Sequence, residues 1–176
     1  IVEWENNWFA LGSATIAIML VMSFSHLVLF WLYREDHASL YFGLLCFVLE
    51  TYTGVGFMQL QHLFLQEASA RDFIVMMQIF FVGSYLALAL LVAFFCAMYP
   101  NEFPAKFAHV VWVLMSVLSG ACFIIGFPQA GYLNIPFFGI TFVVCGIIPV
   151  YLFRSLLNKR TGSLTILTAF AIAGLA

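Results

Sequence analysis

Long apolar runs alternate along this chain with short polar or charged segments. The clearest example is Phe24–Leu45, reading FSHLVLFWLYREDHASLYFGLL, where Arg34-Glu35-Asp36-His37 is the break between two apolar runs. Extended outward, these runs reach back to Trp8 and forward to about Leu60. Each then has about 20 residues or more, which is what an α-helix needs to cross roughly 30 Å of hydrocarbon. The pattern predicts a transmembrane helical hairpin with its charged turn in water.

The rest of the chain repeats this alternation. We predict helices at about 8–33, 38–60, 73–98, 107–127, 135–157 and 163–176, the last one truncated. Asp36 and Asp72 are placed to cap the second and third helices. Two prolines in the stretch YPNEFPAK separate the third helix from the fourth. The predicted fold is an all-α integral membrane protein, a polytopic helical bundle with residues 8–176 as its transmembrane domain.

The composition agrees with a bilayer protein. Hydrophobic residues make up 65% of the chain and charged residues 8%, against about 25% charged in soluble domains. A net charge of -2 gives no reason to expect a nucleic-acid partner. We expect residues 1–7 to be a polar lead from a missing extracytoplasmic part, and the apolar run that stops at Ala176 to continue. The four cysteines lie in apolar runs and are expected to be free thiols.

The positive charges predict an orientation. On the side of the N-terminus, the predicted loops hold Arg71. The opposite side holds Arg34, Lys106, Arg154, Lys159 and Arg160. Cytoplasmic loops carry the excess of Lys and Arg, so we expect an inner-membrane protein with its N-terminus outside. The loops near Arg34, Lys106 and Arg160 are then cytoplasmic. The sixth helix runs outward, and a chain that carries a cytoplasmic domain needs a seventh helix to return.

Three stretches resemble the membrane region of bacterial seven-transmembrane receptors with diverse intracellular signalling modules. They are SHLVLFWLYREDHASLYFGLLCFVLE, YLALALLVAFFCAMYPNEFP and LFRSLLNKRTGSLTILTAF. The resemblance implies six helices of a seven-helix module, located between an extracytoplasmic ligand-binding domain and a cytoplasmic output domain such as a diguanylate cyclase or histidine kinase. It implies no catalytic residue in this segment. The module has the lipid bilayer and these two domains as partners, and a homodimer is compatible with it.

We predict that the carboxyl group of Glu50 lies near the midplane of the bilayer. Hydrocarbon surroundings favour the neutral acid, which can donate a hydrogen bond. Candidate partners on the antiparallel third helix are Ser84 and Tyr85, with Gln78 nearer the outer face. One interpretation is a polar contact that joins two helices. The other is a site that senses a ligand or a proton. The sequence leaves both open.

Pro149 lies inside the fifth helix and frees the carbonyl of Cys145, while Gly146 adds local freedom. A kink is expected, and a functional hinge is the alternative to a purely architectural one. Small residues at Ala10-x-x-x-Ala14 and Ser116-x-x-x-Gly120 offer faces for close helix packing.

Two other functions compete with a receptor. A haem-binding electron carrier would need paired imidazoles from His26, His37 and His109, of which His26 alone is clearly placed inside a span. We expect neither a cofactor nor a metal site. A small-solute transporter usually has matched broken helices in two halves, and Pro149 has no counterpart. The segment contains no nucleophile elbow, zinc-binding helix or phosphate loop, so we do not expect it to be an enzyme.

Overall fold

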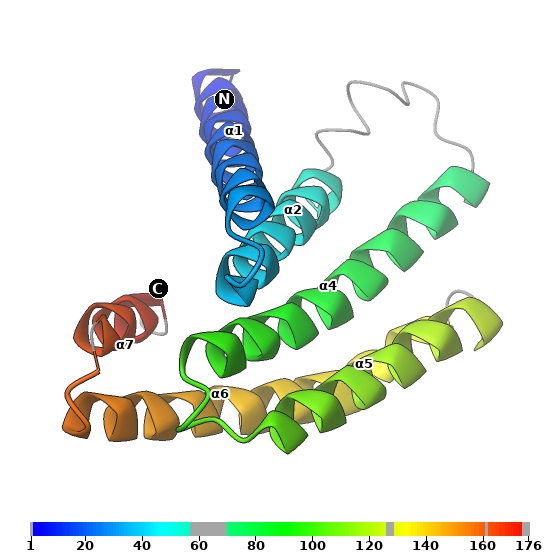
Figure 1. Ribbon diagram of the computed structural model, residues 1–176. Coiled ribbons are helices and arrows are strands. Elements are labelled where there is room, and N and C mark those ends of the chain that lie inside the picture. Colours follow the sequence, from blue (N-terminus) through cyan, green and yellow to red (C-terminus); the bar gives the residue numbers. More distant parts are fainter. Residues whose placement is uncertain (1, 57–69, 126–128, 161, 174–176) are drawn as a thin grey trace.

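The computed structural model describes residues 2–56, 70–125, 129–160 and 162–173, and the regular elements in these ranges are all helical. They are α1 (Val2–Leu32), α2 (His37–Gly56), α4 (Ala70–Met98), α5 (Ala105–Ile125), the 3₁₀ helix η1 (Gln129–Leu133), α6 (Asn134–Leu157) and α7 (Ser163–Ala173) (Figure 1). The predicted all-α class is confirmed. The polar lead differs from the prediction, because helix α1 already begins at Val2.

Among the described residues, four segments are long and apolar enough to cross a membrane: Ala10–Leu32, Ile74–Met98, Ala105–Ile125 and Gln129–Leu157. The last includes η1, in a segment that we expected to be a loop. In α2 the apolar part within the described residues is His37–Thr51, which is shorter than a span. The rest of the predicted second span, up to residue 60, lies outside the described residues.

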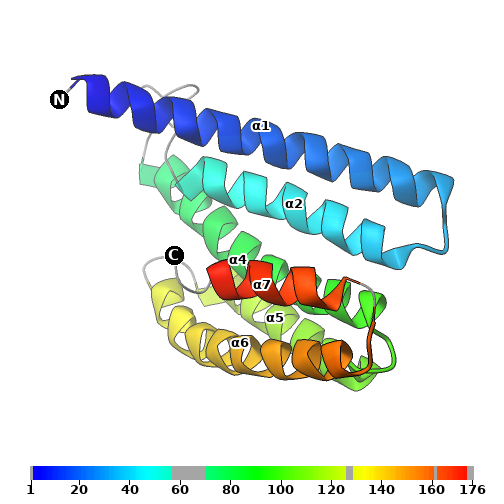
Figure 2. The same ribbon diagram turned by 90° about the vertical axis from the view of Figure 1, so that its left-hand side faces the viewer.

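Helix α4 is the centre of the bundle. The α1–α2 hairpin packs on it through α2, and α5 and α6 pack on its other side (Figures 1 and 2). In the apolar, membrane-length stretch of α4, half of the residues are buried inside the protein, against 6% in the corresponding stretch of α1. The core between α4, α5 and α6 is therefore apolar and tightly packed, with Tyr85, Val92, Met115, Val144, Ile148 and Leu152 among its fully buried members.

Helices α1 and α2 approach each other closely at one glycine. The Ser23 hydroxyl donates a hydrogen bond to the Gly43 carbonyl oxygen over 2.8 Å. A Cβ atom at Gly43 would lie 3.0 Å from Cγ of Leu27 and 3.1 Å from the Ser23 carbonyl oxygen. Small residues allow such close approach of membrane helices. The predicted packing face at Ala10 and Ala14 is instead exposed.

The turn between α1 and α2 ends in the predicted cap. One carboxylate oxygen of Asp36 accepts a hydrogen bond from the Ser39 backbone N–H over 3.1 Å, and the other accepts one from the Ser39 hydroxyl over 2.6 Å. These bonds lower the pKa of Asp36. The prediction for Asp72 differs from the structure, because α4 begins at Ala70 and Asp72 therefore lies inside its first turn.

We predict that Gly43→Val separates α1 from α2, because both the Leu27 side chain and the Ser23 backbone lie within contact of the new side chain. The overpacking should lower the free energy of unfolding by about 2 kcal/mol. Thermal unfolding in detergent measures the effect. Gly120→Val is the matched control, since no atom lies within 4 Å of a Cβ there. Equal destabilisation by both variants would contradict the close approach.

Candidate functional site

The three predicted charged turns lie at one end of the bundle, the right-hand end in Figure 2. Met98, the last residue of α4, connects them. It lines one cavity together with Asp36 and Ala38 of the α1–α2 turn. It also lines a second cavity together with Arg160 and Gly162 of the α6–α7 turn. This end therefore gathers residues from turns that are far apart in the sequence, at the level where the apolar segments stop.

The α4–α5 turn is fixed by aromatic packing. The backbone N–H groups of Glu102 and Phe103 both donate to the Tyr99 carbonyl oxygen, over 3.1 and 3.0 Å. The Phe103 ring is fully buried. It stacks on Phe95 with ring centroids 5.8 Å apart and contacts Tyr151 of α6 at 4.8 Å. The buried ring anchors the turn against α4 and α6, and so it sets the position of the neighbouring Glu102.

The α6–α7 turn begins with a Schellman motif. The Arg160 N–H donates to the Ser155 carbonyl oxygen over 3.1 Å, and the Lys159 N–H donates to that of Leu156 over 2.9 Å. Lys159 is left-handed, with φ 54°, in the position where glycine is the usual residue. The Ser163 hydroxyl then donates to the Arg160 carbonyl oxygen over 2.8 Å. These bonds hold the backbone of Arg160 in place.

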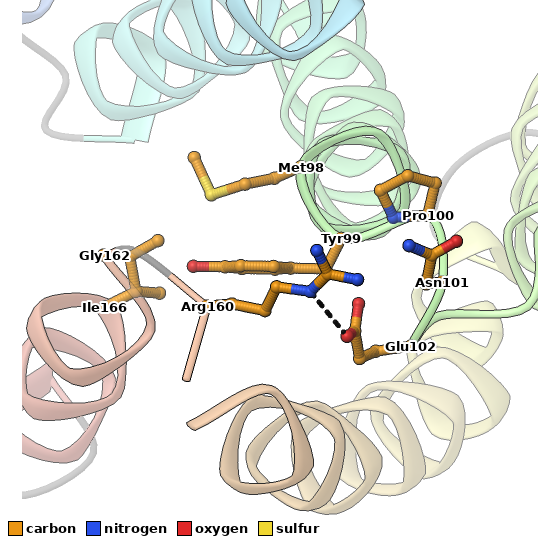
Figure 3. Close-up of a pocket in the computed structure, with 8 residues that line it drawn as sticks. All are labelled: Met98, Tyr99, Pro100, Asn101, Glu102, Arg160, Gly162 and Ile166. Atoms are coloured by element: carbon orange, nitrogen blue, oxygen red, sulfur yellow. Dashed lines mark hydrogen bonds and ion pairs between the residues drawn. The ribbon is translucent and has the colours of Figure 1, made fainter. Parts of the chain in front are cut away.

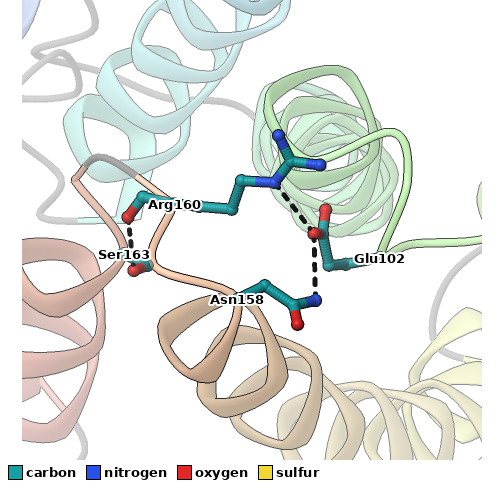
Figure 4. Close-up of polar contacts among 4 residues, drawn as sticks. All are labelled: Glu102, Asn158, Arg160 and Ser163. Atoms are coloured by element: carbon teal, nitrogen blue, oxygen red, sulfur yellow. Dashed lines mark hydrogen bonds and ion pairs between the residues drawn. The ribbon is translucent and has the colours of Figure 1, made fainter.

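Glu102 links the two turns (Figure 4). Its side chain is 3% exposed, and its Oε1 atom lies 3.1 Å from Nε of Arg160. The same oxygen accepts a longer hydrogen bond from the Asn158 amide at 3.4 Å. A buried carboxylate needs such partners, because its charge has lost most of its water. Its position thus ties the α4–α5 turn to the α6–α7 turn.

A cavity of about 440 Å³ opens beside this ion pair. Its walls come from both turns and from α7 (Figure 3): Met98, Tyr99, Pro100, Asn101, Glu102, Arg160, Gly162 and Ile166. The Tyr99 hydroxyl is buried and has no hydrogen-bond partner among the described residues. Burial, together with the nearby charge of Glu102, raises the pKa of Tyr99. The hydroxyl therefore keeps its proton at neutral pH and can donate a hydrogen bond.

A smaller cavity of about 290 Å³ lies between the α1–α2 hairpin and α4. His26 lines it, with its ring 4.6 Å from that of Phe42 in an edge-to-face contact. The Nδ1 atom of His26 is buried and has no hydrogen-bond partner among the described residues. Of the other histidines discussed above, His37 contacts the Glu35 carbonyl oxygen and His109 is exposed. The structure does not bring these imidazoles together as a facing pair.

The structure describes Glu50 and the three residues that were predicted around it. Glu50 is half-buried near the end of the described part of α2. The Tyr85 hydroxyl donates to the Asn134 side-chain oxygen at 3.4 Å, and its ring contacts Phe137, so this residue faces α6. The Ser84 hydroxyl donates to the Phe80 carbonyl oxygen of its own helix. Gln78 is half-buried on the same helix. A sensing role for this group stays a prediction.

The hinge candidates lie within one helix. Helix α6 runs from Asn134 to Leu157 with Pro149 inside it. The neighbouring Ile148 is fully buried in the core. Gly146 is exposed, and a Cβ atom there would meet no atom within 4 Å. Its lack of a side chain is therefore not required by packing, and a hinge at this point stays a prediction.

Glu102 and Tyr99 were not among the functional residues predicted from the sequence. A signal was nevertheless present: Glu102 is an acidic residue between two prolines, in a loop that the charge bias places on the same side as Arg160. The contact between Glu102 and Arg160 joins residues 58 positions apart, and no local sequence pattern encodes it.

Comparisons with known proteins leave the site to be interpreted from its own geometry. No protein-family model, curated protein or solved structure matches the chain.

We predict that Lys159→Gly stabilises the protein, because glycine adopts the left-handed conformation without the strain that a side chain causes. The free energy of unfolding should rise by about 1 kcal/mol. Lys159→Ala removes the same charge but keeps a Cβ atom at φ 54°, so it should give no such gain. Thermal unfolding of both variants in detergent measures the difference. Equal stabilities would mean that the backbone conformation is not the cause.

We predict that Glu102 and Arg160 are energetically coupled. Arg160→Gln leaves the carboxylate buried without its cation, and should cost about 1–2 kcal/mol after allowing for the exposure of the guanidinium group. Glu102→Gln removes the charge that needs a partner. The double variant should therefore be more stable than the sum of the two single effects predicts, by about 1 kcal/mol.

Thermal unfolding of the four proteins in this mutant cycle measures the coupling. Lys106→Gln is the control for a lost charge, since Lys106 is exposed beyond the same turn. Strict additivity in the cycle would show that the contact contributes nothing to stability.

Proposed function

We propose that this chain is the transmembrane module of a bacterial sensor or receptor, with its N-terminus outside and the Glu102–Arg160 end in the cytoplasm. It relays an extracytoplasmic or intramembrane signal to a cytoplasmic output domain, such as a diguanylate cyclase or histidine kinase, outside this chain. In this proposal α7, which is the sixth membrane helix, runs outward, and a further helix beyond it returns to the cytoplasm. The proposal combines the charge bias of the loops with the resemblance to seven-transmembrane receptors.

The observation that carries the proposal is the buried link between two turns. Glu102 belongs to the turn that follows α4, and its partners Asn158 and Arg160 belong to the turn that precedes α7. A displacement of α7 relative to α4 must either carry this link along or break it. Breaking it leaves a buried charge without its cation, which is costly. The two arrangements are therefore discrete, as a two-state switch requires.

The core also supports relay of a signal over passage of a solute. The largest fully buried side chains among the described residues of α4, α5 and α6 are almost all apolar, Val92, Met115 and Leu152 among them. A path for a polar solute would need polar or hydrated walls at this place. A packed apolar core instead transmits a displacement of one helix to its neighbours.

We predict that Glu102→Gln in the full-length protein changes basal output by several-fold and flattens the response to the signal. The neutral side chain keeps its shape but no longer distinguishes the paired from the unpaired arrangement. Output activity in intact cells, corrected for the amount of inserted protein, measures this change. Lys106→Gln is the matched control and should leave output at the wild-type level.

Reporter fusions check the orientation on which this proposal depends. Fusions after Arg34, Lys106 and Lys159 should report from the cytoplasm, and fusions between Gln66 and Arg71 should report from outside. An external signal after Lys159 would overturn the orientation. Wild-type output from Glu102→Gln, with and without stimulus, would overturn the role of the link.

A further inference from the structure

The cavity beside Glu102 lies at the boundary of the membrane-crossing segments. The apolar segment of α4 ends at Met98, that of α6 ends at Leu157, and that of α5 begins at Ala105. Most of the lining residues of the cavity lie directly beyond these ends, in the α4–α5 and α6–α7 turns. In a bilayer this is the level of the lipid phosphates. A phospholipid headgroup is thus the ligand present there at the highest local concentration.

The cavity offers hydrogen-bond donors that the protein itself does not use. Glu102 occupies Nε of Arg160, while the Arg160 side chain is 48% exposed and presents the rest of its guanidinium group at the cavity wall. An arginine fork is well suited to phosphate oxygens. The second donor is the Tyr99 hydroxyl, on a residue that is 4% exposed and has no hydrogen-bond partner among the described residues. A buried donor of this kind requires an explanation.

The two donors occupy different places in the cavity. Figure 3 shows the Tyr99 hydroxyl directed toward Gly162 and Ile166, whereas the Arg160 guanidinium group lies on the side of Glu102. A Cβ atom at Gly162 would lie in ordinary contact with the hydroxyl oxygen, at 3.9 Å, so Gly162 forms the wall next to this donor. A ligand that contacts both donors needs oxygens at more than one position. A phospholipid has them, in its phosphate and in its ester groups.

The other walls and the surrounding charge fit the same ligand. Met98 and Ile166 provide apolar surface on the membrane side of the cavity, against which the start of an acyl chain can lie. The negative charge of Glu102 is balanced by Arg160. Lys106 at the start of α5 and Lys159 of the α6–α7 turn add positive charge at this end, whereas Arg34 of the α1–α2 turn is followed by Glu35 and Asp36. Basic pockets between helices at the cytoplasmic face are typical binding places of anionic lipid headgroups.

We propose that this cavity is a binding site for an anionic phospholipid, in which Arg160 binds the phosphate and the Tyr99 hydroxyl donates to a second lipid oxygen. The site does not depend on the proposed sensor function. A lipid bound there contacts Arg160 from the membrane side and so stabilises the link between the two turns.

The test compares the protein in nanodiscs of phosphatidylcholine alone with nanodiscs that contain increasing phosphatidylglycerol. The midpoint of thermal unfolding is followed as a function of the anionic lipid fraction, and native mass spectrometry counts the lipids that stay bound. The wild type should be stabilised by phosphatidylglycerol. Arg160→Gln should weaken the apparent affinity by about tenfold or more, the size of a lost hydrogen bond to a charged group.

Tyr99→Phe gives the sharper result, because it removes a hydroxyl that has no protein partner. In phosphatidylcholine this variant should be as stable as the wild type or more stable. In phosphatidylglycerol it should lose part of the stabilisation, with an affinity about three- to tenfold weaker. A purely structural role for the hydroxyl would not produce this opposite behaviour in the two lipids. Tyr99→Phe also decides the matter if Arg160→Gln fails to fold.

Arg154→Gln is the control for general surface charge, since Arg154 is exposed in the last turn of α6 and does not line the cavity. It should change the affinity less than about twofold. Inorganic phosphate added to phosphatidylcholine nanodiscs should not stabilise the protein. Three results would each overturn the proposal: a wild-type lipid response from Arg160→Gln and Tyr99→Phe, an equal loss from Arg154→Gln, or full stabilisation by phosphate alone.

Discussion

A carboxylate that is withdrawn from water at the end of an apolar helical bundle constrains the two turns around it. Glu102 is almost fully buried, and its charge is compensated from a turn 58 residues further along the chain. That compensation requires a specific backbone in both turns. On one side it depends on Phe103, whose buried ring is packed between Phe95 and Tyr151. On the other side it depends on the left-handed Lys159, which directs the next residue back toward α4. The ion pair thus forms only when the α4–α5 turn and the α6–α7 turn both adopt these backbone conformations.

The burial of the helices divides the protein into two parts with different packing. Helices α4, α5 and α6 share a core of interlocking aliphatic and aromatic side chains. Helix α1 is largely exposed and contacts its neighbour at the small residues Ser23 and Gly43. In a bilayer the exposed apolar side chains of α1 face lipid, which costs nothing because lipid is as apolar as the core. The hairpin is therefore held by close backbone approach, whereas the other three helices are held by side-chain packing.

Hydropathy was sufficient to predict the helical class, because a bilayer forces every apolar run of this length to form its backbone hydrogen bonds internally. It was also sufficient for the cap at Asp36, which is a local contact. It was not sufficient for long-range contacts. Tyr85 was grouped with Glu50 by depth alone, yet its side chain faces Asn134 on α6. Depth in the membrane gives one coordinate of a residue, and the face of the helix gives the other. In helices that are apolar all round, the sequence carries little information about the face.

The two cavities at the charged end share Met98 as a lining residue. Met98 is the last residue of α4, and it separates the cavity lined by His26 and Asp36 from the cavity lined by Arg160 and Tyr99. Methionine is flexible and fills irregular gaps at low cost. An adaptable side chain therefore lies between the two cavities. The α1–α2 hairpin also packs on α4 through α2, where the rings of Phe42 and Phe94 are in contact. The end of α4 differs from the rest of this interface because residues of both the hairpin and the α6–α7 turn line cavities around one side chain, that of Met98.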